Sequence, residues 1–287
     1  MIDDSVRPRS SSIPLAAGEA LPPFHEAHCA WHSEQRDGDR LLLRLGRQGA
    51  FYAAQDTRYG TLLASADGRS HRFDARDDAD PVLVEKFVAS LVPSLVRQLQ
   101  GKLSLHGSVV CMGESAVAFI GSAFAGKSTF AHACVHFSGA ALLADDTVAF
   151  APFGDGAWVE PMQRGTWLLA ESREFFGLQP SDDRKVLVEV PRATSPKRLQ
   201  MIVLLTDSDR PHAELERVEG YNAFRLLAAH VFRFAHDDPS LQRRELDMLA
   251  NLAPHVGVFL LKRRRDFSTL ESQVALVREA VRALGRA

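Results

Sequence analysis

The chain lacks the marks of several protein classes: it has few cysteines, no long apolar run and little net charge. Its 287 residues contain three cysteines, Cys29, Cys111 and Cys134, without paired spacing. This excludes a disulfide framework and a cysteine-based zinc site, and it predicts reduced thiols in a cytoplasmic protein. No apolar stretch reaches the roughly 18 residues of a membrane span, so we expect no membrane partner.

The charge pattern argues against a nucleic-acid partner. The formal net charge is −2, and Lys262–Arg265 is the one basic run that stands out. We interpret this cluster as a solvated face or the lead-in to a helix. The first residues also lack the charged-then-apolar order of a secretory signal.

The first third of the chain predicts a separate module. Residues 1–20 are rich in Ser, Pro, Ala and Gly, and we expect them to be disordered. Residues 21–100 predict a small β-rich module with a connecting helix from about Pro81 to Gln100, which Pro93 should kink or divide. The apolar runs that predict its strands are 41–45, 51–54 and 61–65.

Residues 101–287 predict an α/β domain with a mixed sheet and flanking helices. Two apolar runs, 108–112 and 116–120, are separated by Gly113 and Glu114, which indicates a hairpin. Further strands are expected at 140–144, 199–205 and 256–261, and helices at 127–137, 223–232, 240–252 and 270–284.

The second hairpin strand leads into a phosphate-binding pattern. The sequence from Gly121 to Ser128, GSAFAGKS, fits G-x-x-x-x-G-K-S/T. Glycines let the backbone turn so that N–H groups cradle phosphate oxygens, and the following helix adds its positive end. Lys127 is expected to reach the β- and γ-phosphates, and the Ser128 hydroxyl to bind magnesium. The predicted nucleotide-binding residues are Gly121, Ser122, Ala123, Phe124, Ala125, Gly126, Lys127, Ser128 and Thr129.

The alternative for this pattern is a glycine-rich turn with an incidental lysine. The loop follows an apolar run and opens a predicted helix, as a phosphate cradle requires, and this context favours the binding interpretation.

A pair of carboxylates follows at Asp145 and Asp146, where the next predicted strand ends. Such a pair can divide magnesium binding from the removal of a hydroxyl proton. Because side chains alternate along a strand, the two can point to different partners, or one can simply cap the turn. His106 lies before the hairpin and, taken alone, is most simply a hydrogen-bonded histidine.

These motifs, in this order from Leu105 to Phe150, resemble the catalytic core of HPr kinase/phosphorylase and its relatives. In that family a His-Gly pair precedes a hairpin and a P-loop, and an Ala-Asp-Asp signature follows. The resemblance implies that His106 is the active-site histidine, that Asp145 is the proton acceptor and that Asp146 is a magnesium-associated carboxylate.

The remainder of the chain resembles the shorter HPr-kinase-like proteins found with peptide-modifying gene clusters. Those include kinases that phosphorylate a serine of lasso-peptide precursors. The segment Glu160–Gly165 departs from the family's Glu-Arg-Gly signature in its spacing, which argues against HPr as the acceptor and against phosphorylase activity. Glu160 is either a second acidic ligand or an ordinary surface or turn residue. Arg164 and Lys185 either neutralise the charge of the transferred phosphoryl group or are ordinary exposed residues.

The resemblance implies an ATP- and Mg²⁺-dependent kinase that phosphorylates a serine hydroxyl of a peptide or small protein, plausibly a ribosomal peptide precursor. It also implies a homo-oligomer, since relatives are often hexameric. The alternative is a nucleotide-dependent switch or binding protein without phosphoryl transfer, which needs only one magnesium carboxylate and no base.

Overall fold

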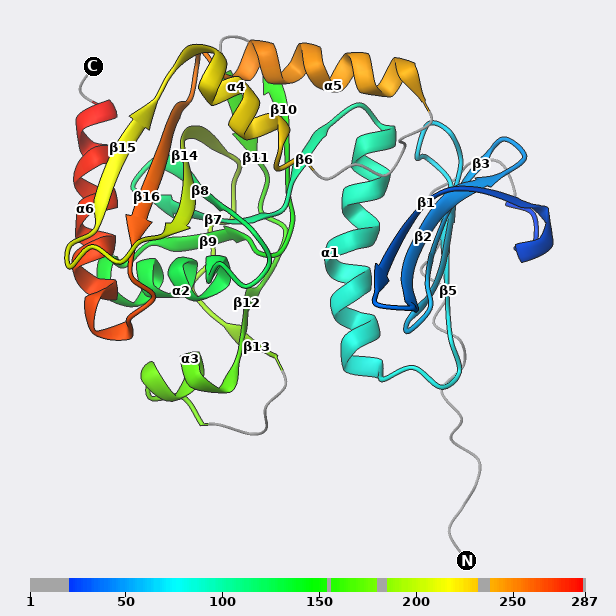
Figure 1. The fold of residues 1–287 in the computed structure, drawn as a ribbon, viewed down its shortest axis with the longest axis horizontal. Helices are drawn as coiled ribbons and strands as arrows, with labels where there is room; N and C mark the ends of the chain where they lie inside the picture. Colours follow the sequence, from blue (N-terminus) through cyan, green and yellow to red (C-terminus); the bar gives the residue numbers. More distant parts are fainter. Residues whose placement is uncertain (1–20, 154–155, 180–184, 232–237, 286–287) are drawn as a thin grey trace, which may run out of the picture. The chain divides into compact units, whose positions relative to one another are not determined.

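The computed structural model describes residues 21–153, 156–179, 185–231 and 238–285. The chain divides into two compact units, one of Met1–Lys102 with Arg233–Arg244 and one of Leu103–Phe232 with Glu245–Ala287 (Figure 1). The expected disorder of residues 1–20 lies outside the described residues. None of the helices in the described ranges is long and apolar enough to cross a membrane.

The first unit is an antiparallel meander of five strands with one long helix. Tight turns join the first strands, and Gly38 and Gly49 have φ values of 57° and 61° in these turns, a conformation that glycine adopts without strain. The elements are η1 (Glu26–His28), β1 (Cys29–Asp37), β2 (Arg40–Gln48), β3 (Phe51–Asp56), β4 (Gly60–Ala64), β5 (His71–Ala75) and α1 (Pro81–Leu99).

Helix α1 begins where its capping residues predict. The Asp80 side chain accepts a hydrogen bond from the backbone N–H of Val82, and Pro81 occupies the first turn. The sequence predicts that Pro93 kinks or divides the helix; it does not divide it, because α1 runs as one helix through Pro93. An interior proline costs about 3 kcal/mol, and burial of the apolar side of the helix, including Leu95, Val96 and Leu99, offsets this cost.

The second unit is built on a nine-stranded mixed sheet. Strands β8, β14 and β16 are parallel neighbours at its centre, whereas β7 pairs antiparallel with β8 and β9. The strands are β6 (Leu103–Leu105), β7 (Gly107–Met112), β8 (Ser115–Ile120), β9 (Ala141–Ala144), β10 (Val148–Phe153), β11 (Gly156–Val159), β14 (Lys197–Asp207), β15 (Glu214–Val218) and β16 (Gly257–Arg263).

Helices cover both faces of this sheet, and alternation along its strands explains how. On β8, Ala118 and Ile120 belong to one buried core, whereas Val117 and Phe119 belong to the other. The first core includes residues of α4 (Gly220–Ala228) and α5 (Pro239–Leu252), and the second includes residues of α2 (Lys127–Ser138) and α6 (Leu270–Leu284). Both faces of β8 are therefore buried, as a continuous apolar run predicts.

A smaller hairpin stands apart from the large sheet. It pairs β12 (Gly165–Leu168) with β13 (Val186–Glu189), and α3 (Ala170–Phe175) follows β12. A 3-10 turn, η2 (Phe267–Thr269), precedes α6. The central parallel strands all end on the side where the β8–α2 loop begins, which is where open α/β sheets bind ligands.

Candidate functional site

The loop from Gly121 to Gly126 joins β8 directly to α2. Gly121 and Gly126 have φ values of 150° and 81°, and Gly126 is the left-handed N-cap of α2. A Cβ on Gly126 would lie 3.0 Å from an Arg263 nitrogen, and one on Gly121 would lie 3.1 Å from the carbonyl oxygen of Leu205. Conformation and space both favour glycine at these two positions.

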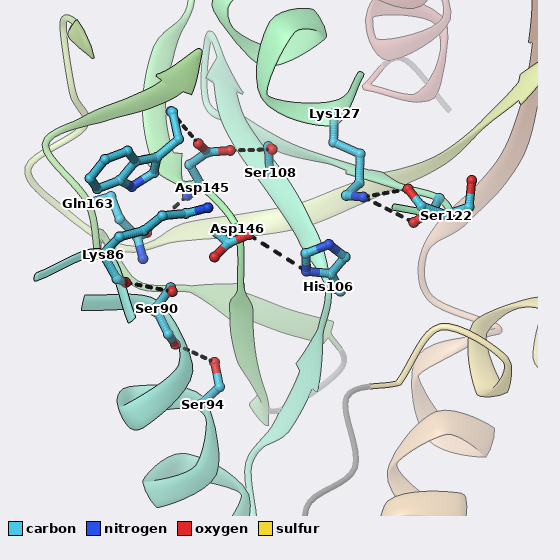
Figure 2. Close-up of polar contacts among 12 residues, drawn as sticks. Lys86, Ser90, Ser94, His106, Ser108, Ser122, Lys127, Asp145, Asp146 and Gln163 are labelled. Carbon is cyan, nitrogen blue, oxygen red and sulfur yellow. Dashed lines mark hydrogen bonds and ion pairs between the residues drawn. The ribbon is translucent and has the colours of Figure 1, made fainter. Parts of the chain in front are cut away.

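Lys127 is buried at the base of this loop, with 7% of its surface exposed. Its Nζ donates hydrogen bonds to the carbonyl oxygens of Gly121, at 3.1 Å, and Ser122, at 2.8 Å (Figure 2). Burial lowers the pKa of Lys127 to about 8, so the ammonium is still mostly protonated at neutral pH. The side chain is therefore a buried cation that donates its hydrogen bonds to neutral carbonyl groups.

Asp145 lies at the end of β9 and is fully buried. Its Oδ1 accepts a hydrogen bond from Ser108 Oγ at 2.5 Å, and its Oδ2 accepts one from the backbone N–H of Trp167 at 2.8 Å (Figure 2). Burial raises the pKa of Asp145 in spite of these bonds. Asp145 therefore connects strand β7 and strand β12.

The Asp146 side chain has different neighbours from the Asp145 side chain, because the backbone turns at Asp146. Its φ is 73°, a left-handed conformation that is uncommon outside glycine, asparagine and aspartate. Its carbonyl accepts a hydrogen bond from the N–H of Gly107 at 3.2 Å, which fixes the turn. Its Oδ1 lies 3.9 Å from His106 Nδ1 (Figure 2). Burial, followed by the charge of Lys127, lowers the pKa of His106, so the imidazole is neutral at pH 7.

The loop and the carboxylate turn face a common cavity of about 380 Å³. All of its lining residues belong to the second unit. The lining residues predicted from the sequence are His106, Ala123, Phe124, Gly126, Lys127, Ser128, Thr129 and Asp146, with Lys185 among the alternatives. The remaining lining residues are Trp167, Leu169, Glu171, Ser172, Arg263, Arg265, Asp266, Phe267 and Leu270.

Several predicted positions do not line this cavity. Four of them belong to the loop and to the carboxylate turn: Gly121, Ser122, Ala125 and Asp145. Glu160 and Arg164 also lie outside the lining, and Arg164 pairs with Glu189 at 3.6 Å.

The sequence interpretation missed Arg263, which was assigned to a solvated basic run. Arg263 is only 4% exposed. It follows Phe259 and Leu261 at a spacing of two along β16, and both of these residues belong to the core that includes α2. This alternation is the signal that places Arg263 on the buried side, since side chains two apart on a strand share a face.

Ser128 and Asp146 are the predicted magnesium ligands, and both line the cavity. Within the described ranges, no group of three or more His, Cys, Asp or Glu side chains is arranged to hold a metal by itself. Magnesium at nucleotide sites is usually held by one or two protein oxygens together with substrate phosphates and water. The oxygens of Ser128 and Asp146 are of the type that such a site requires.

Comparisons with known proteins find similarity among solved structures. No family model matches the sequence, and no curated protein matches it. Among solved structures, the chain is similar to the Hpr(Ser) kinase/phosphatase from Coxiella burnetii, with 11% sequence identity and a TM-score of 0.34. The similarity covers 62% of this chain and 98% of that chain. At this TM-score it carries no functional argument, and the site geometry has to provide one.

Proposed function

We propose that the protein is a phosphotransferase that uses a magnesium-bound nucleoside triphosphate, ATP in the first instance, to phosphorylate a serine hydroxyl. The observation that carries the proposal is one cavity with a buried cation on one side and a carboxylate–imidazole pair on the other. Lys127 provides the cation, and Asp146 and His106 provide the pair.

A triphosphate fits the loop side of the cavity. The N–H groups at the start of α2 and the Lys127 ammonium form the positive end that a phosphate chain needs. Ser128 is the residue that would hold magnesium, which neutralises charge on the phosphate oxygens when bound, and Asp146 is kept for the acceptor proton.

The acceptor side fits a hydroxyl group. In the proposed reaction the hydroxyl oxygen forms a bond to the γ-phosphorus, and the bond from that phosphorus to the β–γ bridging oxygen breaks. The nucleoside diphosphate leaves, and the hydroxyl proton passes to the Asp146 carboxylate, as general-base catalysis requires. Neutral His106 faces the same carboxylate, with its Nδ1 3.9 Å from Asp146 Oδ1.

The family resemblance assigned the proton to Asp145, and we propose a different division of roles. Asp145 is fully buried and already accepts hydrogen bonds from Ser108 and Trp167, so it has no route to an acceptor in the cavity. Its bonds from Ser108 and from the backbone of Trp167, which lines the cavity, support a positioning role for Asp145 instead. Asp146 lines the cavity and supports the role of base.

The acceptor is proposed to be a peptide or small protein, such as a ribosomal peptide precursor, on the strength of the sequence resemblance. The test is incubation with γ-labelled ATP, Mg²⁺ and serine-containing peptides, followed by mass analysis of the products. A mass increase of one phosphoryl group on serine supports the kinase. Nucleotide binding without transfer to any hydroxyl would instead support the nucleotide-dependent switch.

A further inference from the structure

Arg263 is the last residue of β16, and its charge is buried with no carboxylate partner in the part of the chain that the structure describes. Its guanidinium lies 5.4 Å from the Phe130 ring centroid, and its Nη2 donates a hydrogen bond to the carbonyl oxygen of Ala125 at 2.8 Å. Its Nε is buried and has no hydrogen-bond partner. Among the described residues, no acidic group lies within ion-pairing distance of it. One N–H of the five that arginine offers is therefore matched to an acceptor.

Burial on this scale is costly for a cation. Burial lowers the pKa of Arg263 to about 10, so the group still carries its charge at neutral pH. A charge removed from water destabilises the fold unless an opposite charge compensates it. Asp207 stands opposite Arg263 where β14 pairs with β16. This carboxylate already has a partner, because both of its oxygens accept hydrogen bonds from Arg265, each at 2.6 Å.

The position of Arg263 indicates what compensates the charge. The side chain lines the same cavity as Lys127 and Ser128. One of its nitrogens is 3.0 Å from the place where a Cβ of Gly126 would stand. Gly126 is the N-cap of α2, whose free N–H groups favour an anion. The guanidinium thus lies beside the part of the loop that would receive phosphate oxygens.

We propose that Arg263 is a phosphate-binding residue that donates hydrogen bonds to the di- or triphosphate chain and also holds the loop through Ala125. This inference rests on the proposed nucleotide function and adds a second buried cation to Lys127. A planar guanidinium suits this role because it can donate to a phosphate oxygen and a backbone carbonyl at the same time.

Arg263→Met is the decisive variant, because methionine fills the space of the apolar part of the arginine side chain and removes the charge. Titration calorimetry with pyrophosphate and with ATP·Mg²⁺ should show affinities about 10- to 100-fold weaker than wild type, the range for hydrogen bonds to charged groups. The melting temperature of the ligand-free variant should be unchanged or higher, because a buried charge without a carboxylate has been removed.

Arg264→Gln is the matched control. Arg264 is the next residue along the chain, is exposed and does not line the cavity, so its loss should change pyrophosphate affinity by less than about threefold. Arg263→Lys keeps the charge without the fork of donors, and we expect an affinity between those of wild type and Arg263→Met.

A purely structural arginine would give the opposite pattern. In that case Arg263→Met would melt at a lower temperature but bind pyrophosphate within about twofold of wild type, and the proposal would be overturned. If Arg263→Met does not fold, Arg263→Lys decides the matter, because wild-type pyrophosphate affinity in that variant would exclude a contact specific to the guanidinium. A wild-type protein that binds neither pyrophosphate nor ATP·Mg²⁺ would overturn the nucleotide function itself.

Discussion

The two units treat buried charge in opposite ways. In the first unit, Asp56 is 2% exposed, and Arg58 neutralises it with hydrogen bonds of 3.0 Å and 2.6 Å to its two oxygens. In the second unit, Lys127 and Arg263 are similarly buried but contact neutral carbonyl groups. The first arrangement is complete within the protein, whereas the second leaves positive charge for the proposed phosphate ligand to neutralise. Burial without a counter-charge therefore indicates the binding site more specifically than burial alone.

The largest effect is expected at Asp146. Asp146→Asn should reduce phosphoryl transfer roughly 10²- to 10⁴-fold, the usual contribution of a general base. Asparagine tolerates the left-handed backbone at this position, so the fold should be retained. Initial rates with γ-labelled ATP and a serine peptide, together with nucleotide affinity measured separately, test this expectation.

Asp145→Asn is the comparison for that experiment. The amide would bring a second donor toward the N–H of Trp167, so we expect a lower melting temperature and a smaller loss of transfer per folded molecule. The reverse result, with transfer abolished by Asp145→Asn and retained by Asp146→Asn, would restore the assignment implied by the family resemblance.

The next effect concerns the buried ammonium. Lys127→Met should weaken ATP·Mg²⁺ binding by about 10- to 100-fold, because it removes a charge-assisted contact to the phosphates. It should not lower the melting temperature of the ligand-free protein, since among the described residues the ammonium donates hydrogen bonds only to carbonyl groups and to no carboxylate. Calorimetric titration and a thermal melt on the same sample measure both quantities. Unchanged ATP affinity would show that the cavity is not the phosphate site.

A smaller effect is expected from His132, a neutral group inside the second unit. It is 6% exposed, its Nδ1 lies 2.9 Å from Thr166 Oγ1, and burial lowers its pKa from 6.5 to about 4. Between pH 6.5 and about pH 4, His132 takes up a proton in the unfolded chain but not in the native protein. The free energy of unfolding therefore decreases as the pH falls through this range. At pH 5 the loss is about 2 kcal/mol relative to pH 7.

Denaturant unfolding at pH 7 and pH 5 measures that loss in the wild type and in His132→Gln. Glutamine can still bond to Thr166 but does not titrate, so the pH-dependent difference should shrink by the same amount. An identical pH dependence in the two proteins would contradict a buried neutral His132.

The smallest effect is expected in the first unit. Arg76 and Asp78 form an exposed ion pair at 2.8 Å, and such pairs contribute little because solvent screens them. Arg76→Gln should leave the unfolding midpoint unchanged within error in a denaturant titration. A clear loss of stability would show that the ion pairs of this unit matter more than their exposure indicates.

The parts that were predictable from sequence are those that local chemistry determines. The β7–β8 hairpin, the glycine loop and the start of α2 at Lys127 follow from short-range turn and helix rules. Strands β10 to β13 and β15 were not assigned individually. They are short, and their pairing partners can lie far away in sequence: β12 pairs with β13, and β15 pairs with β16.

The site was predictable to a similar extent. The motif located Lys127, Ser128 and the aspartate pair, because each belongs to a recognisable pattern. It could not indicate which aspartate reaches the cavity, since that depends on the turn at Asp146 and on the distant donors Ser108 and Trp167. Arg263 was missed because a run of basic residues suggests exposure to solvent. Only the burial of one face of β16 distinguishes Arg263 from the other basic residues of the run.

The left-handed backbone of Asp146 sets a constraint on engineering this protein. A non-glycine residue in that conformation costs on the order of 1 kcal/mol or more, so Asp146→Gly should raise the melting temperature. A library screened for heat resistance alone would therefore enrich glycine at a position where the carboxylate is proposed to do the chemistry. Directed evolution of this protein has to select for turnover and heat resistance together, or it will discard the first while improving the second.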